Sequence, residues 1–233
     1  MYYPMYYDVT YILVLIGVVI CLLASAKMNS TFKRYSKVRN QAGLTGREAA
    51  EEVLRRAGIY DVRVEHVSGN LTDHYDPRNK VLRLSDATYN STSVAAVGVA
   101  AHECGHAIQH ATGYAPLNFR SALVPVANFG SKIAWPLIVL GLLFSSRASL
   151  LLIEMGILAF SLAVLFQLVT LPVEFNASNR AIRILAGTGM LQGDEIRSTR
   201  KVLTAAALTY VASAASSILQ LLRLVLLTRG RRD

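Results

Sequence analysis

Charge is scarce in this sequence. Of its 233 residues, only 17% are charged and 53% are hydrophobic, whereas a typical soluble domain has about 25% charged residues. Three long stretches have no charge at all, namely 18 residues between Asp8 and Lys27, 19 between Glu154 and Glu174, and 21 between Lys201 and Arg223. A helix that crosses a bilayer needs about 20 such residues. The scarcity of charge therefore excludes a plain soluble enzyme and predicts a multi-pass membrane protein.

Cysteine is also rare. Cys21 lies in the first apolar run, and Cys104 lies far along the chain in a predicted helix. Two cysteines so placed do not make the disulfide framework of a small secreted protein. For Cys104 we favour the role of a small buried residue, which is the usual one for a free cysteine in a helix.

Acidic residues are fewer than basic ones. The sequence has 15 Asp and Glu and 24 Lys and Arg, which gives a net charge of +9. A basic balance of this size also occurs in nucleic-acid-binding proteins, but the sequence contains no nucleic-acid recognition motif. The basic residues instead lie beside the apolar runs, at Lys27, Lys33, Arg34, Lys37 and Arg39, and at Arg229, Arg231 and Arg232. That placement is typical of contacts with anionic lipid headgroups and of topology control. We therefore predict a lipid bilayer, and no nucleic acid, as a partner.

The N-terminal segment lacks the basic n-region and the small-residue cleavage site of a secretory signal peptide. We therefore expect residues 1–26 to form a retained transmembrane anchor. Its tyrosines suit a membrane interface; they are Tyr2, Tyr3, Tyr6, Tyr7 and Tyr11. Because the basic cluster follows the anchor, the positive-inside rule places the N-terminus outside the cell and the chain from residue 27 onward in the cytoplasm.

Soluble character is confined to residues 27–120, for which we predict a cytoplasmic domain. Thr45 and Glu48 have the spacing of a capping box, in which each side chain satisfies a backbone amide of the other residue. The helix that they open is amphipathic and ends at Gly58. This short helix indicates that the segment folds as a domain rather than as a linker.

Three strands and a second helix are predicted to complete this domain. Alternation of apolar and polar residues indicates the strands, and a tight turn at residues 76–79 joins the last two. The strands are expected at residues 62–67, 71–75 and 80–84, and the helix from Ser91 or Ser93 to about Ala111.

The remaining chain is mostly apolar. Residues 121–173 predict a transmembrane helical hairpin with an external turn at Arg147, and residues 174–202 predict a cytoplasmic segment that begins with a helix. Residues 203–233 predict a C-terminal transmembrane or membrane-associated helix with a basic tail. A single crossing would place that tail outside, against the charge rule. Either its arginines snorkel or the helix does not fully cross.

Residues 102–106 have the pattern H-E-x-x-H. On a helix, His102 and His106 lie one turn apart and face the same way, so both imidazoles can bind one zinc ion and leave room for a further ligand and a water. Glu103 lies beside them and can take the proton of that water as a general base. The pattern also recurs by chance as two helix-surface histidines. The small apolar residues 94–101 before it predict a buried helix, where unpartnered polar groups are costly, and favour zinc.

A catalytic zinc ion normally takes three protein ligands, and the third has four candidates, which are His66, His74, His110 and Glu174. His110 lies one turn beyond His106, but one rigid helix does not easily close three ligands around a metal. Glu174 follows an apolar run, and a second helix crossing beside the first would bring it to the histidines. A charge that merely ends a span is equally common. The spacing alone leaves this choice open.

Three segments resemble the YugP-type membrane zinc metallopeptidases, which are multi-pass bacterial proteins related to the gluzincins. They are LTDHYDPR at residues 71–78, LS at 84–85 and GVAAHECGHAIQ at 98–109, and the resemblance covers essentially the whole chain. In that family and in the similar HtpX-like peptidases, a glutamate that begins an E-F-x-A-S/D motif is the third zinc ligand. The resemblance therefore implies that Glu174, which begins Glu174-Phe175-Asn176-Ala177-Ser178, binds the metal.

The same motif bears on the support of a ligand histidine. HtpX-like relatives usually have aspartate at its fifth position, where it steadies a ligand histidine. This chain has Ser178 there, and the neighbouring Asn179 is the other candidate for that role. Asp73-His74-Tyr75-Asp76 also belongs to the resemblance, so His74 or Tyr75 is expected to contact substrate or its oxyanion, although a histidine in such a segment is often only a turn residue. An exposed edge strand there could hold a peptide by strand addition.

The fold class that follows is mostly α: a multi-pass membrane protein with about four transmembrane helices and a zincin-like domain that has a small β-sheet and an HExxH helix. The expected function is a membrane-embedded zinc endopeptidase, with one Zn²⁺ per chain on His102, His106 and Glu174 and with Glu103 as the general base. Its expected substrates are unfolded or membrane-proximal polypeptides. Its site is expected to face the cytoplasm at the bacterial cell membrane. An oligomer or a regulatory membrane partner is compatible with this function.

Two other functions are weighed against this one. The first is a non-catalytic, zinc-stabilised membrane adaptor that binds client proteins. Glu103 disfavours it, because a structural zinc site is closed by four protein ligands and has no need of a carboxylate beside them. The second is an intramembrane protease of the site-2 type, which would place the motif inside a long span. Here the motif follows a soluble, charged segment, so this class ranks last.

Overall fold

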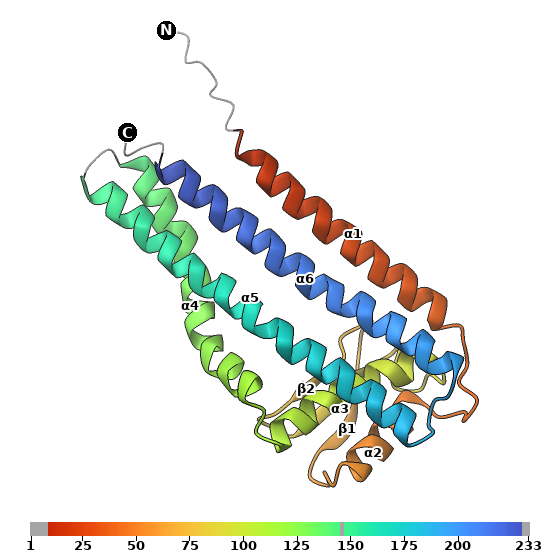
Figure 1. Ribbon diagram of the computed structural model, residues 1–233. Coiled ribbons are helices and arrows are strands. Elements are labelled where there is room, and N and C mark those ends of the chain that lie inside the picture. The colour runs from red at the N-terminus through yellow and green to blue at the C-terminus, as the bar shows by residue number, and fades with distance from the viewer. Residues whose placement is uncertain (1–8, 145–146, 230–233) are drawn as a thin grey trace. The chain divides into compact units, whose positions relative to one another are not determined.

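The computed structural model describes residues 9–144 and 147–229, with six helices and three strands (Figure 1). The helices are α1 (Tyr11–Tyr35), α2 (Gly46–Arg56), α3 (Val94–Ala111), α4 (Ala115–Leu143), α5 (Arg147–Gly187) and α6 (Asp194–Arg229). The strands are β1 (Arg63–Val67), β2 (His74–Asp76) and β3 (Val81–Ser85). Four of the predicted interface tyrosines, residues 145–146 and the tail from residue 230 lie outside the described residues, and Arg147, where we predicted the external turn, is the first residue of α5.

Four of these helices are long and apolar enough to cross a membrane, namely α1, α4, α5 and α6. The remaining elements are the short helices α2 and α3 and the small sheet. The predicted fold class, a mostly α multi-pass membrane protein with about four transmembrane helices and a small sheet, is therefore confirmed. Helix α5 continues unbroken through residue 173, so the boundary that we predicted there falls inside a helix.

The described residues divide into two compact units. The described parts of the first are residues 9–24, 120–144, 147–169 and 210–229. Its helices approach each other through small residues. A Cβ atom at Gly130 would lie 2.7 Å from the carbonyl oxygen of Ala159, and one at Gly17 would lie 2.6 Å from Oγ of Ser216. Such close approach gives α4–α5 and α1–α6 the van der Waals contact that holds helices together where the solvent is lipid.

The second unit comprises residues 25–119 and 170–209 and contains the sheet. The strand order is β1-β3-β2, with β1 parallel and β2 antiparallel to β3. The central strand β3 buries most of its side chains, whereas β2 is an edge strand. The core of this unit includes Val53 of α2, Leu82 of β3, Val97 of α3, Leu185 of α5 and Val202 of α6. The sheet and segments of α2, α3, α5 and α6 therefore share one apolar core.

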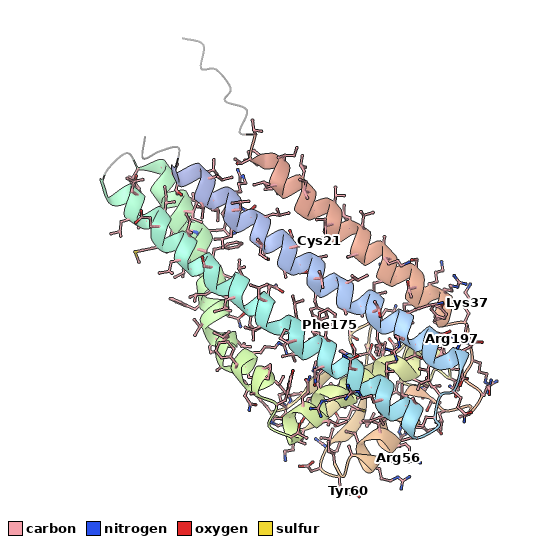
Figure 2. The ribbon with its side chains drawn as sticks, viewed as in Figure 1. Cys21, Lys37, Arg56, Tyr60, Phe175 and Arg197 are labelled. Carbon is pink, nitrogen blue, oxygen red and sulfur yellow. The ribbon has the colours of Figure 1, made fainter. Side chains whose placement is uncertain are left out.

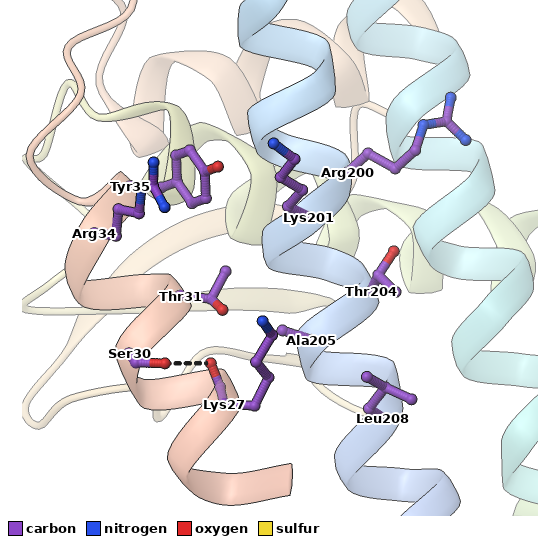
Figure 3. A pocket seen from close by; sticks show the side chains of 10 residues that line it. All are labelled: Lys27, Ser30, Thr31, Arg34, Tyr35, Arg200, Lys201, Thr204, Ala205 and Leu208. Atoms are coloured by element: carbon purple, nitrogen blue, oxygen red, sulfur yellow. Dashed lines mark hydrogen bonds between the residues drawn. The ribbon is translucent and has the colours of Figure 1, made fainter.

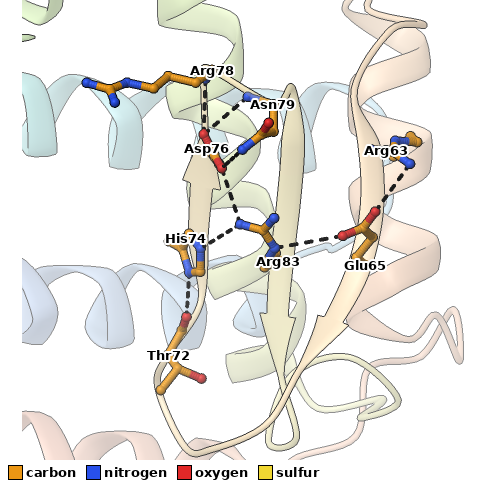
Figure 4. Close-up of polar contacts among 8 residues, drawn as sticks. All are labelled: Arg63, Glu65, Thr72, His74, Asp76, Arg78, Asn79 and Arg83. Atoms are coloured by element: carbon orange, nitrogen blue, oxygen red, sulfur yellow. Dashed lines mark hydrogen bonds and ion pairs between the residues drawn. The ribbon is translucent and has the colours of Figure 1, made fainter.

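Local signals placed most elements of this unit correctly. The capping box of Thr45 and Glu48 is present, and Gly58 has the left-handed φ of +71° that ends a helix readily at glycine. Helix α3 begins after Ser93, whose side chain accepts a hydrogen bond from the amide of Ala96. In the turn after β2, the carboxylate of Asp76 accepts from two backbone amides, as an Asx turn requires (Figure 4).

The strand expected at residues 71–75 was wrong in extent, because β2 begins only at His74. Leu71 has a φ of +57°, which interrupts an extended backbone. The next interruption comes from Asp73, whose carboxylate accepts hydrogen bonds from both the amide and the hydroxyl of Ser85. A side chain therefore takes the position that a strand backbone would have filled, and only three residues pair with β3.

Candidate metal centre

Helix α3 carries the H-E-x-x-H pattern and is buried along most of its length. Two glycines let neighbouring helices approach it closely. A Cβ atom at Gly98 would lie 2.5 Å from the side chain of Thr199 in α6, and one at Gly105 would lie 2.6 Å from the carbonyl oxygen of Ala177 in α5. The contact at Gly105 lies inside the motif. It therefore holds the segment of α5 around Ala177, one turn after Glu174, directly against the histidine-bearing turn.

His102, His106 and Glu174 converge at this contact. Oε2 of Glu174 lies 3.3 Å from Nε2 of His102 and 3.6 Å from Nε2 of His106. All three candidate ligand atoms lie within 4.8 Å of one another. In the part of the chain that the structure describes, these residues form the one cluster of three or more His, Cys, Asp or Glu side chains that could hold a metal ion.

Glu174 supplies the test of whether a cation fits this cluster. The residue is only 3% exposed, and its Oε2 has no hydrogen-bond partner among the described residues although it is buried. A buried carboxylate oxygen without a partner is costly. Since two imidazole nitrogens face the same oxygen, a shared cation removes that cost. Two nitrogen ligands and one carboxylate are also a ligand set that zinc accepts.

The electrostatic field at the site also favours positive charge. Burial alone lowers the pKa of His106, but the nearby carboxylates of Glu174 and Glu103 outweigh it. The pKa of His106 is consequently raised above its ordinary value. The two carboxylates thus stabilise a positive charge at this imidazole, and a divalent cation would receive the same stabilisation.

Gln109 orients one of the imidazoles. Its Nε2 donates hydrogen bonds to the carbonyl oxygen of Val173 at 2.8 Å and to Oδ1 of Asn176 at 3.0 Å. Because a carbonyl oxygen only accepts, these bonds leave Oε1 of Gln109 to face Nδ1 of His106, 3.0 Å away. His106 must then carry its proton on Nδ1, and the lone pair of Nε2 points to Glu174.

Ser178 occupies the corresponding position at the other imidazole. Its Oγ lies 3.0 Å from Nδ1 of His102. The second candidate for this role, Asn179, is exposed, and no hydrogen bond joins it to either histidine among the described residues. Phe175, which follows Glu174, is 43% exposed (Figure 2). One face of α5 therefore supplies both Glu174 and Ser178.

Glu103 is nearly buried, with 9% of its surface exposed. No hydrogen bond engages its carboxylate within the described ranges. It adjoins His102 in α3, and its negative charge acts on His106. The carboxylate is therefore close enough to His106 to act on its charge, and its lone pairs are free to accept a proton.

The other histidines considered as ligands are engaged elsewhere. Nε2 of His66 lies 2.6 Å from the carboxylate of Asp86. In His74, Nδ1 faces the carbonyl oxygen of Thr72 at 2.8 Å and Nε2 faces the guanidinium of Arg83 at 3.4 Å (Figure 4). Neither histidine approaches Glu174, so the structure brings only Glu174, of the four candidates, to the pair on α3.

Tyr75 connects the edge strand β2 to the last turn of α3. Its hydroxyl lies 3.0 Å from Nδ1 of His110. His110, the fourth candidate ligand, is therefore also engaged outside the cluster. Burial raises the pKa of Tyr75, and the carboxylates of Asp61 and Asp76 raise it further. The phenol therefore stays protonated at neutral pH and can donate a hydrogen bond.

Sequence reasoning assigned no role to Gln109 or Asn176. Both lie inside the sequence motifs that contain the candidate metal ligands, Gln109 three residues after His106 and Asn176 two residues after Glu174. Asn176 also accepts a hydrogen bond from Nε of Arg180 at 2.7 Å. For Gln109 the available signal was its position one helical turn after His106, since side chains three or four residues apart meet on a helix.

Comparison with known proteins decides the family. The family model described as "Putative neutral zinc metallopeptidase" matches residues 10–229. The chain belongs to this family. It is also 50% identical over 210 residues to the "Putative membrane protease YugP" of Bacillus subtilis (strain 168), covering 90% of this chain and 92% of that protein. No solved structure matches the chain significantly. The resemblance found in the sequence is confirmed, and membership of this zinc peptidase family agrees with the His102, His106 and Glu174 cluster.

Proposed function

We propose that this protein is a membrane-embedded zinc endopeptidase whose single Zn²⁺ is held by His102, His106 and Glu174. The observation that carries the proposal is the buried, unpartnered Oε2 of Glu174 facing Nε2 of both histidines. Three protein ligands are the usual set at a catalytic zinc site, where a fourth position stays open to water. Within the described residues no fourth His, Cys, Asp or Glu joins the cluster, which favours this open arrangement over the closed site of an adaptor.

Zinc at this position would polarise a carbonyl group and lower the pKa of water bound to it. Glu103 carries out the proton transfers. Its carboxylate accepts the proton of the attacking water and passes it to the nitrogen of the leaving amine, so that one residue acts first as base and then as acid. Gln109 and Ser178 keep Nδ1 of the two imidazoles occupied and thereby hold their Nε2 atoms toward Glu174.

The substrate is proposed to be an unfolded or membrane-proximal polypeptide that adds to the edge strand β2. This strand packs against α3, and its order in the sheet leaves one side without a neighbouring strand among the described residues. Backbone hydrogen bonds to such an edge hold a peptide without reading its side chains. Tyr75 is the better placed residue to donate to a substrate carbonyl, because its hydroxyl can accept a hydrogen bond from Nδ1 of His110 and still donate its own proton, whereas both ring nitrogens of His74 already have partners.

The orientation proposed in the membrane places the site in the cytoplasm of a bacterial cell and the N-terminus outside. The basic residues between Lys27 and Arg39 support it by the positive-inside rule. The proposed domains are the anchor (1–26), the cytoplasmic domain (27–120), the hairpin (121–173), the third-ligand segment (174–202) and the C-terminal helix (203–233). The compact unit of residues 25–119 and 170–209 supports joining the second and fourth of these around the metal.

The test compares Glu103→Gln with wild type in the purified full-length protein, using fluorescein-labelled casein as the unfolded substrate. Removal of the general base is expected to slow cleavage by about 100-fold to 10,000-fold, while the zinc content measured by mass spectrometry stays at one per chain. The control variant Glu51→Gln changes an exposed glutamate paired with Arg47 and should leave both readings unchanged. Equal cleavage by Glu103→Gln and wild type would refute the catalytic role and favour the zinc-stabilised adaptor.

A further inference from the structure

A second polar site lies away from the metal cluster, between α1 and α6. This pocket has a volume of about 600 Å³ (Figure 3). Four cationic side chains line it, namely Lys27 and Arg34 of α1 and Arg200 and Lys201 of α6. No carboxylate lines it, and none of the four cations forms an ion pair within the described part of the chain. Uncompensated positive charge from two helices therefore gathers around one cavity, which favours an anionic ligand.

The pocket lies where the two helices change from charged to apolar sequence. In α1 the charge-free run ends at Ala26, immediately before Lys27, and in α6 the charge-free run begins at Val202, immediately after Lys201. Figure 3 shows Lys27 and Lys201 on neighbouring helices around the same cavity. In a membrane, such transitions lie at the level of the lipid headgroups, where basic residues contact phosphate.

The lining of the pocket is amphiphilic. Thr31 and Thr204 supply hydroxyl groups beside the cations, whereas Ala205 and Leu208 continue the lining of α6 into its apolar run. Thr31 is only 8% exposed, so part of the pocket lining is buried. A free phosphate ion would use the cations and hydroxyls alone. Apolar residues on one side match the acyl chain of a lipid.

We propose that this pocket binds the phosphate group of an anionic phospholipid, with the acyl chain along Ala205 and Leu208. The ammonium groups of Lys27 and Lys201 donate charge-assisted hydrogen bonds to the phosphate oxygens from opposite helices. Such a lipid would bridge α1 and α6 at the side of the membrane where their charge-free runs meet Lys27 and Lys201. This binding does not depend on zinc or on peptidase activity.

The test measures lipid binding to the purified full-length protein in a non-ionic detergent by native mass spectrometry. The probe is dioleoyl phosphatidylglycerol, and the comparison ligands are dioleoyl phosphatidylcholine, glycerol 3-phosphate and inorganic phosphate. The double variant Lys27→Gln, Lys201→Gln removes one cation from each helix. The matched control, Lys33→Gln, Lys37→Gln, removes the same charge from exposed positions near the end of α1 that do not line the pocket (Lys37 is labelled in Figure 2).

Phosphatidylglycerol affinity is expected to fall by about tenfold or more in Lys27→Gln, Lys201→Gln, and by less than about twofold in the control pair. The charge-preserving variant Lys27→Arg, Lys201→Arg should bind as wild type does. Inorganic phosphate and glycerol 3-phosphate at millimolar concentration should not displace the lipid. If the double Gln variant does not fold, Lys201→Gln alone is expected to show a smaller loss in the same direction.

Three results would overturn the proposal. Equal losses in the pocket and control pairs would mean that diffuse positive charge, rather than this cavity, attracts the lipid. Phosphatidylcholine bound as tightly as phosphatidylglycerol would mean that the cations do not select an anion. Displacement by inorganic phosphate would assign the pocket to a free phosphate ion instead of a lipid.

Discussion

Gln109 of α3 donates a hydrogen bond to the carbonyl oxygen of Val173 in α5, the residue immediately before Glu174. The same side chain faces Nδ1 of His106 through its Oε1. One fully buried amide therefore sets the direction of His106, a proposed ligand, and also ties its helix to the one that carries Glu174. Because the orientation of His106 and the packing of α3 against α5 both depend on Gln109, a substitution of this residue should weaken both.

The first prediction concerns Gln109→Met, which keeps the length of the side chain and removes its polar atoms. His106 loses the partner of its Nδ1, and the carbonyl of Val173 loses its donor. Loss of such an outer hydrogen bond typically weakens metal binding by about 10-fold to 100-fold, which competition with a chromophoric chelator would measure. Gln41→Met changes an exposed glutamine that is not part of the cluster and should keep wild-type affinity. Wild-type zinc affinity in Gln109→Met would contradict the orienting role.

The second prediction concerns zinc removal. Because Oε2 of Glu174 is buried without a hydrogen bond among the described residues, the metal-free protein retains a costly group that zinc compensates. A ligand that binds only the folded state at 100 times its Kd adds about 2.7 kcal/mol to the free energy of unfolding. Thermal unfolding in detergent should therefore show a higher Tm with zinc than with EDTA.

Glu174→Gln separates this effect from nonspecific zinc binding. The substitution keeps the shape of the side chain and removes the charge that holds the ion, so the difference in Tm between zinc and EDTA should disappear. Glu51→Gln, on the exposed face of α2, should retain the full difference. A zinc-dependent Tm that survives in Glu174→Gln would show that the ion binds elsewhere.

Sequence could predict what depends on neighbours along the chain. The capping box at Thr45, the start of α3 at Ser93 and the one-turn spacing of His102 and His106 are all local, and the structure contains each of them. The edge strand was mispredicted because Asp73 bonds to Ser85, a residue twelve positions away that no local pattern reveals. Side-chain competition of this kind is settled only by the tertiary fold.

The choice of the third ligand also depends on contacts between residues that are distant in the sequence. Spacing alone did not decide whether Glu174 binds the metal, because Glu174 reaches the histidines only where Gly105 lets α5 approach α3. The resemblance to a family favoured Glu174, and the geometry agrees. Neither spacing nor resemblance pointed to Gln109, whose role depends on three acceptors or donors from two helices.

Ser178 supplies the third prediction. Its hydroxyl is the partner of Nδ1 in His102, so Ser178→Ala should weaken zinc binding by about tenfold, at the lower end of the usual range for such a partner. Ser178→Asp places a carboxylate at the same position and should bind zinc at least as tightly as wild type, since a carboxylate increases the basicity of the imidazole. The chelator competition assay gives both affinities. Equal affinity in the Ala, Asp and wild-type proteins would remove Ser178 from the metal centre.

Gly105 supplies the fourth prediction, which concerns packing. A Cβ atom there would lie 2.6 Å from the carbonyl oxygen of Ala177, a backbone atom that cannot move alone. Gly105→Ala should therefore force α3 and α5 apart and cost about 1–3 kcal/mol in the free energy of unfolding, with weaker zinc binding as a consequence. Gly187→Ala is the matched control, because a Cβ atom at that helical glycine meets nothing within 4 Å. Equal Tm values for the two variants would contradict the close contact at Gly105.

The last prediction distinguishes the two candidates for substrate contact. Tyr75→Phe removes only a hydroxyl whose pKa is raised by burial and by two carboxylates, and which can therefore donate to a substrate carbonyl at neutral pH. One such donor to a developing oxyanion is worth about 100-fold in kcat, so cleavage of labelled casein should slow by up to that factor while zinc affinity stays unchanged. His74→Ala should have a smaller effect, because its ring nitrogens face Thr72 and Arg83. If His74→Ala instead loses more activity than Tyr75→Phe at equal zinc content, the oxyanion role passes from the phenol to the imidazole.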